Sequence, residues 1–290
     1  MGINYMVDLG DKVKSYENEE ARRILPPVQP IVVRLDGRGF SKWTRDLAIP
    51  FDAGFRRLME KTARDVAEEA NAVFCHTQSD EITLVLRGNG NPVGSLAYFG
   101  GRIQKMVSSL AARASVVFNA SLAEYLPVKA GQSSLPTFDC RVWSVPTEQD
   151  ACDVIRWREA DARVNSVSMV ARTHFSHSQV FEKSTKELVT MLSNKGERFY
   201  DYPVEFRRGI HIQRKLVERT FTASEMENLP KKHRARTTPD LMVLRKDLVK
   251  VNLPPFCIIS NAVNVVFNGA DPVTQEESNG RDSFTEEDHI

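Results

Sequence analysis

Two acidic motifs in the first third of the chain carry the side chains best suited to chemistry. One motif, Asp-Gly-Arg-Gly, occupies residues 36–39, and the other, Gln-Ser-Asp-Glu, occupies residues 78–81. Two carboxylates a few ångströms apart repel each other, and protonation or a divalent cation relieves that repulsion. Mg²⁺ prefers one or two carboxylates together with water and substrate phosphates. If Asp36 and Asp80 meet, they predict two-metal phosphoryl transfer, with the ions about 4 Å apart.

The glycines of the first motif support this interpretation but also allow a simpler one. Gly37 and Gly39 would let the backbone approach a triphosphate, with amides directed at phosphate oxygens. However, an Asp-Gly pair after a strand is a common turn whose Asp caps backbone amides, and hairpin turns are rich in Ser and Asp. The residue types alone leave both interpretations open.

Hydrophobic patterning predicts the elements that must position these motifs. We expect a strand ending at Asp36, a helix capped by Asp52, two strands around the second motif, a second long helix and a further strand. Their expected ranges are 31–36, 52–70, 73–75, 82–86, 96–117 and 138–145. This order predicts an α+β fold, a ferredoxin-like split βαβ antiparallel sheet with two helices on one face. In that topology Asp36 lies beside the hairpin turn that carries Asp80.

The remainder of the chain adds to this core. We expect residues 1–145 to form the catalytic core and residues 146–270 a helical extension, with a helix over 148–175 and irregular strands near Ile210 and Val265. Residues 271–290 contain seven acidic residues and one basic residue, and we expect a disordered tail there. The first 270 residues carry 38 basic and 31 acidic residues, a balance compatible with a polyanionic partner or with an ordinary solvated surface.

Composition excludes several classes of protein. The 290 residues are 41% hydrophobic and 27% charged, and no apolar run approaches the roughly 20 residues that span a bilayer. The polar, acidic start is unlike a signal peptide. The cysteines at 75, 140, 152 and 257 form no C-x-x-C pair, which argues against a disulfide scaffold or a Cys-based zinc site. We expect a cytoplasmic protein with no membrane association.

Several blocks, in order along residues 8–275, resemble the tRNA-histidine guanylyltransferase (Thg1) family, and more closely its bacterial-type Thg1-like branch. The blocks are residues 34–40, 50–52, 77–82, 138–143, 157–161, 165–169, 175–177, 195–196 and 208–209. The resemblance implies a polymerase-palm fold. It also implies a tRNA partner, 3′–5′ addition of nucleotides to the tRNA 5′ end, two Mg²⁺ ions, GTP, ATP and other nucleoside triphosphates as substrates, and a homotetramer.

The resemblance also assigns roles to residues of this chain. It implies a metal site at Asp36, the Gly37 carbonyl and Asp80, with Glu81 acting catalytically from behind these ligands. The implied nucleotide-binding residues are Asp36, Gly37, Arg38, Gly39, Phe40, Ser41, Ser79 and Asp80. Contacts to RNA or triphosphate are expected from Asn165, Lys195 and Arg208, which lie in the matching blocks. The charge of Lys231, Lys232, Arg234 and Arg236 also suits an RNA contact, although it suits a solvated loop equally well.

Two departures from the family pattern affect these expectations. Ile49 stands where members with robust 5′-end activation often carry Lys before the proline, so the cation for activation is left to Lys42 or Arg45. Residues 163–166, Arg-Val-Asn-Ser, replace the His-Ile-Asn-Asn run of the eukaryotic branch, which favours the Thg1-like branch over strict histidine-tRNA specificity. A nucleotidyl cyclase and a non-catalytic RNA-binding protein of the same fold remain the alternatives.

Overall fold

The computed structural model describes residues 2–88, 98–238 and 240–275, with side chains from residue 7 onward. Its centre is a six-stranded antiparallel sheet of order β4-β1-β3-β2-β5-β6. The strands are β1 (Ile31–Arg38), β2 (Phe74–Gln78), β3 (Glu81–Leu86), β4 (Thr137–Ser144), β5 (Ile210–Arg219) and β6 (Val243–Val251). The predicted α+β fold class is confirmed, and β1 and β3 are adjacent as the split βαβ topology requires.

The longer helices are α1 (Gly2–Ala21), α3 (Ala53–Glu69), α4 (Ile103–Ala120) and α6 (Glu148–His174). The shorter ones are α2 (Phe40–Trp43), α5 (Leu122–Tyr125), α7 (His177–Val180), α8 (Thr185–Asn194), α9 (Val204–Arg208), α10 (Ala223–Asn228) and α11 (Ala262–Asn268). The expected N-cap of α3 is confirmed, because the Asp52 carboxylate accepts a hydrogen bond from the Phe55 amide. The expected helix over 96–117 begins later, at Ile103; residue 96 lies outside the described residues.

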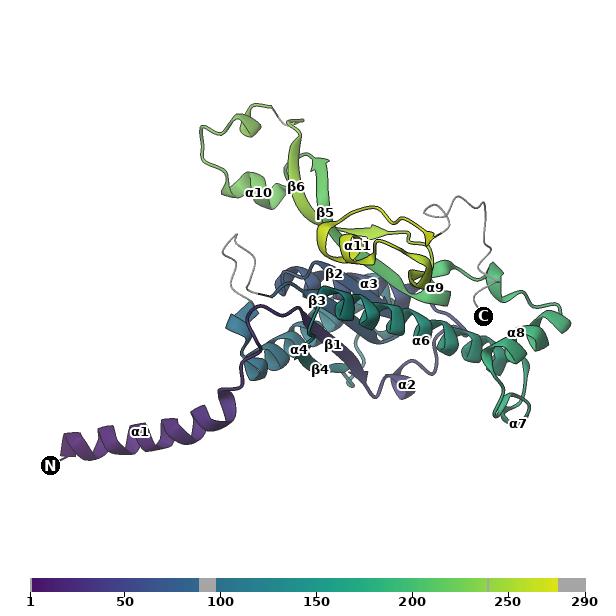
Figure 1. Cartoon of the computed structure of the whole chain (residues 1–290), viewed down its shortest axis with the longest axis horizontal. Helices are drawn as coiled ribbons and strands as arrows, with labels where there is room; N and C mark the ends of the chain where they lie inside the picture. The colour runs from purple at the N-terminus through teal and green to yellow at the C-terminus, as the bar shows by residue number, and fades with distance from the viewer. Residues whose placement is uncertain (1, 89–97, 239, 276–290) are drawn as a thin grey trace.

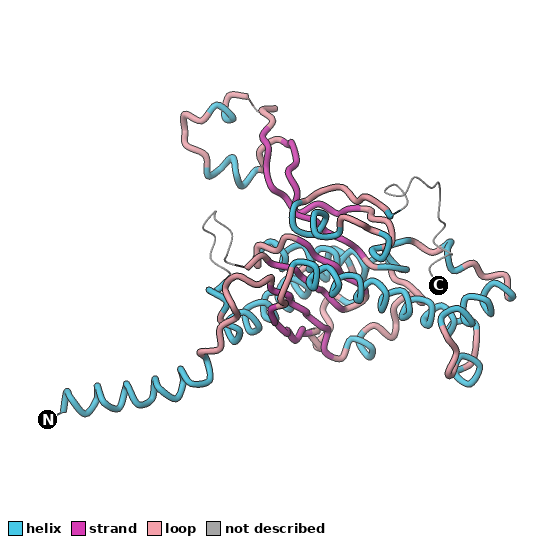
Figure 2. The backbone as a smooth tube through the Cα atoms, viewed as in Figure 1, coloured by secondary structure: helices cyan, strands magenta, loops and turns pink. Residues whose placement is uncertain are grey.

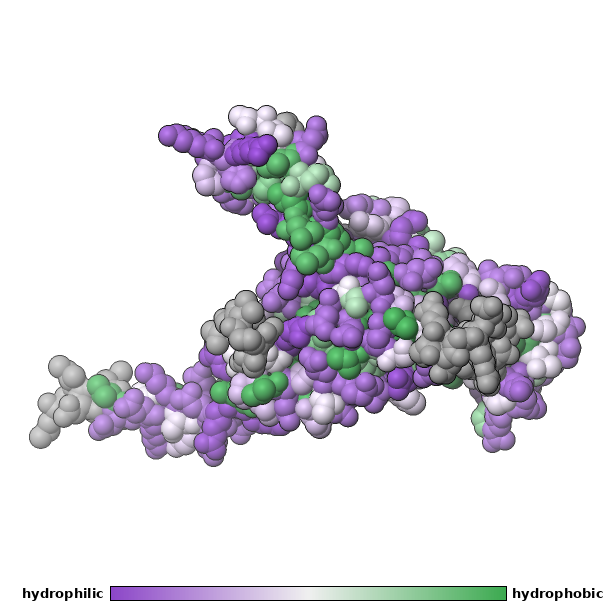
Figure 3. Space-filling view, turned by 45° about the horizontal axis from the view of Figure 1, so that its top comes forward, coloured by the Kyte–Doolittle hydropathy of each residue, from purple (hydrophilic) through white to green (hydrophobic). Residues whose placement is uncertain are grey.

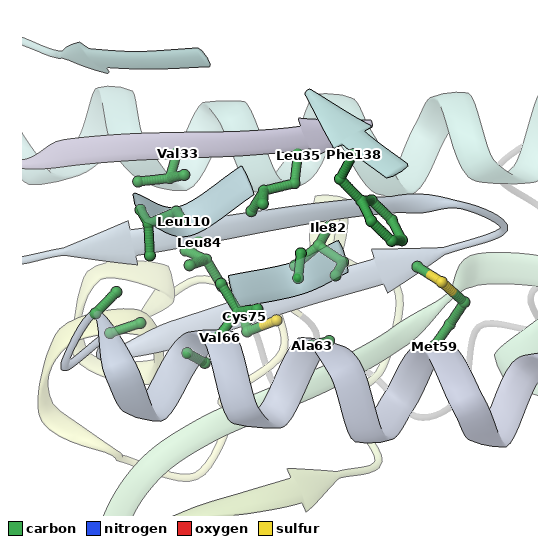
Figure 4. Packing of buried hydrophobic residues seen from close by; sticks show 14 of the residues in the cluster. Val33, Leu35, Met59, Ala63, Val66, Cys75, Ile82, Leu84, Leu110 and Phe138 are labelled. Carbon is green, nitrogen blue, oxygen red and sulfur yellow. The ribbon is translucent and has the colours of Figure 1, made fainter. Parts of the chain in front are cut away.

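Alternation along β1 gives the sheet two apolar faces. Val33 and Leu35 point into a core formed with α3 and α4 (Figure 4). Val32 points the opposite way, into a second core with α6 and α11. The two helices expected on one face are therefore α3 and α4, while α6 of the extension covers the other face. This second core packs α6 against the face of the sheet opposite α3 and α4.

The extension also widens the sheet. The strand expected near Ile210 is confirmed as β5, which pairs with β2 and with β6. The strand expected near Val265 is wrong: this segment is helix α11, because Ala262, Val265 and Val266 recur at helical spacing and bury one face in the second core. The sheet thus runs across the expected boundary at residue 145, and residues 276–290 of the expected tail lie outside the described residues.

Two elements project from the body. Helix α1 extends away at one end, and the outer halves of β5 and β6 form an arm that carries α10 (Figures 1 and 2). The tip of the arm is largely hydrophilic (Figure 3). Within residues 2–88, 98–238 and 240–275, no helix combines the length and apolar character that a bilayer span requires.

Candidate active site

The end of β1 lies against the β2–β3 turn. The Gly37 amide donates a hydrogen bond to the Asp80 carbonyl at 3.1 Å, which ties the two predicted motifs together. A Cβ on Gly37 would lie 2.4 Å from the Phe40 ring and 2.8 Å from the Asp80 Cβ. Only glycine fits this contact. The expected strand end at Asp36 is wrong, because Asp36, Gly37 and Arg38 continue β1 and pair with β4.

The second motif is a two-residue turn. Gln78 and Glu81 are paired across β2 and β3, which leaves Ser79 and Asp80 as the turn itself. Ser79 has a φ of +53°, a left-handed conformation that a serine adopts at an energetic cost and that is common at functional sites. Its hydroxyl donates to the Asp80 carboxylate at 3.1 Å. The turn therefore holds the Asp80 side chain at the sheet end.

The electrostatics of Asp80 indicate a site for positive charge. Burial raises the pKa of Asp80, and the negative charge of Asp36 raises it further, against hydrogen bonds from the backbone and from Ser79. No Lys or Arg among the described residues forms an ion pair with either carboxylate, and no group of three metal-ligating side chains occurs there. Two carboxylates without a protein cation suit Mg²⁺, which completes its shell with water and phosphates.

Glu81 is held differently from its neighbour. Its carboxylate forms ion pairs with Arg34 and, at 3.2 Å, with Arg158. Burial raises the pKa of Glu81, while the two guanidinium groups act in the opposite direction. Arg158, whose side chain is 8% exposed, also pairs with Asp161. Both carboxylate oxygens of Glu81 are therefore paired with arginines, an arrangement that suits a supporting role behind Asp36 and Asp80.

A cavity of about 530 Å³ opens in front of these residues. One wall is the sheet end and the other is α6. Its lining comprises Arg34, Asp36, Ile49, Gln78, Ser79, Asp80, Glu81, Asp161, Asn165, Ser168, Met169, Arg172 and Thr173. Asn165 was expected at the site, whereas Ser168 and Arg172 were missed. The signal was available, because the spacing from Asp161 through these three residues follows one face of a helix.

A smaller hollow of about 160 Å³ adjoins the first. The two share Ile49, Gln78, Ser79 and Met169 in their linings. The rest of the smaller hollow is lined mainly by the segment 44–56 and by α9. Sequence reasoning missed this hollow, since its walls come from four segments distant in the chain.

The remaining residues of the expected nucleotide loop divide by exposure. Phe40 is 2% exposed and packs against the rings of Phe118 and Phe138, so its side chain belongs to the core. Arg38 and Ser41 are exposed, and none of residues 37–41 is in the lining of the 530 Å³ cavity. Gly39 has a φ of +72°, which lets the chain turn from β1 into α2.

The expected RNA contacts are spread widely. The Lys195 ammonium donates to the His174 carbonyl at 2.6 Å, and Arg208 is buried, 3.6 Å from Glu159. Neither residue lines the cavity described above. The exposed run Lys231, Lys232, Arg234 and Arg236 lies on the arm instead. Arg236 is bonded to the carbonyls of Glu227 and Leu229, which makes it a structural part of that loop.

Fold and site together define a palm-type nucleotidyltransferase. The family model described as tRNAHis guanylyltransferase matches residues 10–146. A probable tRNA(His) guanylyltransferase from Dictyostelium discoideum is 30% identical over 225 residues, covering 72% of this chain and 83% of that protein. The mouse counterpart is 28% identical over 263 residues, covering 82% of this chain and 84% of that protein.

Solved structures agree with the sequence comparisons. A bacterial tRNA(His) guanylyltransferase (Thg1)-like protein in complex with ATP is 33% identical, with a TM-score of 0.65, covering 71% of this chain and 88% of that one. A bacterial Thg1-like protein in complex with GTP is 25% identical, also with a TM-score of 0.65, covering 86% of this chain and 94% of that one. This chain belongs to the tRNA-histidine guanylyltransferase family, which confirms the resemblance seen in its motifs.

Proposed function

We propose that this chain adds nucleotides to the 5′ end of tRNA in the 3′–5′ direction at the cavity formed by Asp36 and Asp80. Family membership confirms the coarser prediction, an enzyme that transfers a nucleotide to a tRNA 5′ end. The observation that carries the finer proposal is the pair of carboxylates, tied together through Gly37, without an ion-paired cation among the described residues.

Asp36, Asp80 and the Gly37 carbonyl would hold two Mg²⁺ ions. When bound, these ions would neutralise phosphate charge and make the attacking hydroxyl more acidic. The chain itself positions the reactants. The Ser79 hydroxyl hydrogen-bonds to the Asp80 carboxylate, and the two arginines on Glu81 keep the Glu81 carboxylate in place.

In the proposed reaction, the 3′-hydroxyl oxygen of the incoming nucleotide forms a bond to the α-phosphorus of a 5′-triphosphate on the RNA. The bond to the β-phosphate breaks, and pyrophosphate leaves. A 5′-monophosphate is first activated: its oxygen forms a bond to the α-phosphorus of ATP or GTP and pyrophosphate leaves. The nucleoside monophosphate added in this way is then the leaving group when the 3′-hydroxyl attacks. The relatives with bound ATP and GTP support nucleoside triphosphates as substrates. We further propose a cytoplasmic homotetramer, with tRNA contacts at the arm and at Asn165.

The test uses the purified full chain with Mg²⁺, all four nucleoside triphosphates and a tRNA that lacks its first 5′ nucleotide. Gel-resolved extension of the triphosphorylated form is expected from the wild type. Asp36→Asn and Asp80→Asn should each abolish it, while Asp153→Asn removes the same charge from an exposed pair on α6 and should leave extension intact. Extension by both site variants would refute the assignment. Failure of the wild type would favour a cyclase or an RNA-binding protein.

A further inference from the structure

The cavity wall opposite the carboxylates is a single face of α6. Asp161, Asn165, Ser168 and Arg172 are spaced by four, three and four residues, which places them on one side of the helix. All four line the cavity. The stripe begins at the Glu81–Arg158 network, because Asp161 is paired with Arg158 and accepts from the Asn165 amide at 3.3 Å. The stripe ends at Arg172, two residues before the last residue of α6.

The two arginines in the cavity lining differ in what they contact. The guanidinium group of Arg34 forms an ion pair with the Glu81 carboxylate. Arg172 is exposed, and within the described part of the chain its guanidinium group forms no ion pair or hydrogen bond. Lys42 and Arg45, which the sequence offered as cations for activation of the 5′ end, are not in the cavity lining. Ile49 lines the same cavity and is 75% exposed, and its side chain is apolar, so that part of the wall supplies no charge.

We infer that Arg172 binds the phosphates at the 5′ end of the RNA and thereby supplies, from α6, the positive charge that position 49 lacks. This inference rests on the proposed function. Guanidinium groups bind phosphate oxygens through paired, charge-assisted hydrogen bonds. The metal-binding carboxylates lie on the facing wall, and a phosphate chain that reaches them passes through the cavity that Arg172 borders. Asn165 and Ser168 offer neutral hydrogen-bond partners along the same stripe.

The test compares Arg172→Gln with Arg156→Gln. Arg156 lies on α6 outside the cavity lining, where it pairs with Asp153 at 2.8 Å, so both variants remove one positive charge from the same helix. Steady-state extension is measured with RNAs that carry a 5′-triphosphate or a 5′-monophosphate. A 5′-hydroxyl RNA serves as a competitive inhibitor. Thermal unfolding confirms that each variant is folded.

We expect Arg172→Gln to raise the KM for both phosphorylated RNAs roughly tenfold or more, the usual loss for one charge-assisted contact. The inhibition constant of the 5′-hydroxyl RNA should stay unchanged, and Arg156→Gln should resemble the wild type. Equal effects of the two variants would overturn the assignment, as would a change confined to the KM of the nucleoside triphosphates. Arg172→Lys should retain part of the affinity.

A second variant tests the link to Ile49. Adding Ile49→Lys to Arg172→Gln places an ammonium in the same cavity and should recover a substantial part of the lost affinity for phosphorylated RNA. A wild-type KM in Arg172→Gln alone would refute the inference, and a raised KM that Ile49→Lys does not lower would refute the claim that Arg172 replaces a cation at position 49. Failure of the proposed function is distinguishable, because the wild-type chain would then extend none of the RNAs.

Discussion

Replacing Gly37 by alanine tests the contact that joins the two motifs. The added Cβ would lie 2.4 Å from the Phe40 ring and 2.8 Å from the Asp80 Cβ, whereas ordinary contact begins at 3.4 Å. The overlap is thus between about 0.6 and 1 Å. The Phe40 ring is 2% exposed, with the Phe118 and Phe138 rings centred 5.2 Å away, so it has little room to retreat. Residue 37 and the Asp80 turn that is hydrogen-bonded to it must therefore shift together.

Two magnitudes follow from this displacement. Overpacking of a well-packed contact costs about 1–3 kcal/mol of unfolding free energy. A misplacement near 1 Å at a reacting centre lowers the rate on the order of 100-fold. We therefore expect Gly37→Ala to fold with reduced stability and to lose far more activity than its stability explains.

The assay pairs urea unfolding with single-turnover extension of triphosphorylated tRNA. Gly131→Ala is the control, because Gly131 has a φ of +79° with nothing within 4 Å of the added Cβ. It should cost about 1–2 kcal/mol through backbone strain alone and leave the site in place. Activity of Gly37→Ala within about threefold of this control would refute the reasoning.

Three further predictions follow from other parts of the molecule. Ile49→Lys should increase the use of 5′-monophosphorylated relative to triphosphorylated RNA; an unchanged ratio of extension rates would make Ile49 irrelevant to activation. A second variant neutralises three exposed cations of the arm, Lys231, Lys232 and Arg234, and keeps Arg236, which holds the loop. It should bind tRNA more weakly and reduce the slope of log Kd against log salt by about 2–3. An unchanged slope would indicate a solvated loop. Burial lowers the pKa of His76 to about 4, with a contribution from His211, so the unfolded chain takes up the proton first as pH falls. The unfolding free energy should therefore be fully present above pH 6.5 and fall by up to roughly 3 kcal/mol towards pH 4; urea unfolding of His76→Gln should show a weaker pH dependence, and His177→Gln is the exposed control.

The sequence predicted those elements whose secondary structure is decided by residues close together in the chain. The β-branched run before Asp36 predicted β1, and Asp52 predicted the start of α3. The order of strands and helices predicted the sheet topology that brings Asp36 beside the β2–β3 turn. Ile210 marked β5. Val265 misled, because a short apolar run packs equally well as a strand or as one face of a helix, and only the second core decides between them.

The sequence by itself determined the fold class, the family and the two motifs of the site, since these depend on spacing along the chain. Tertiary structure decided which charges remain available. In the sequence, Arg208 and Lys195 cannot be distinguished from cations that bind phosphate. In the structure, Arg208 lies against Glu159, and Lys195 donates a hydrogen bond to the His174 carbonyl. No sequence motif indicated Arg172, but it lines the cavity that contains Asp36 and Asp80. An ion pair forms between side chains that folding brings together, so its partners cannot be read from spacing alone.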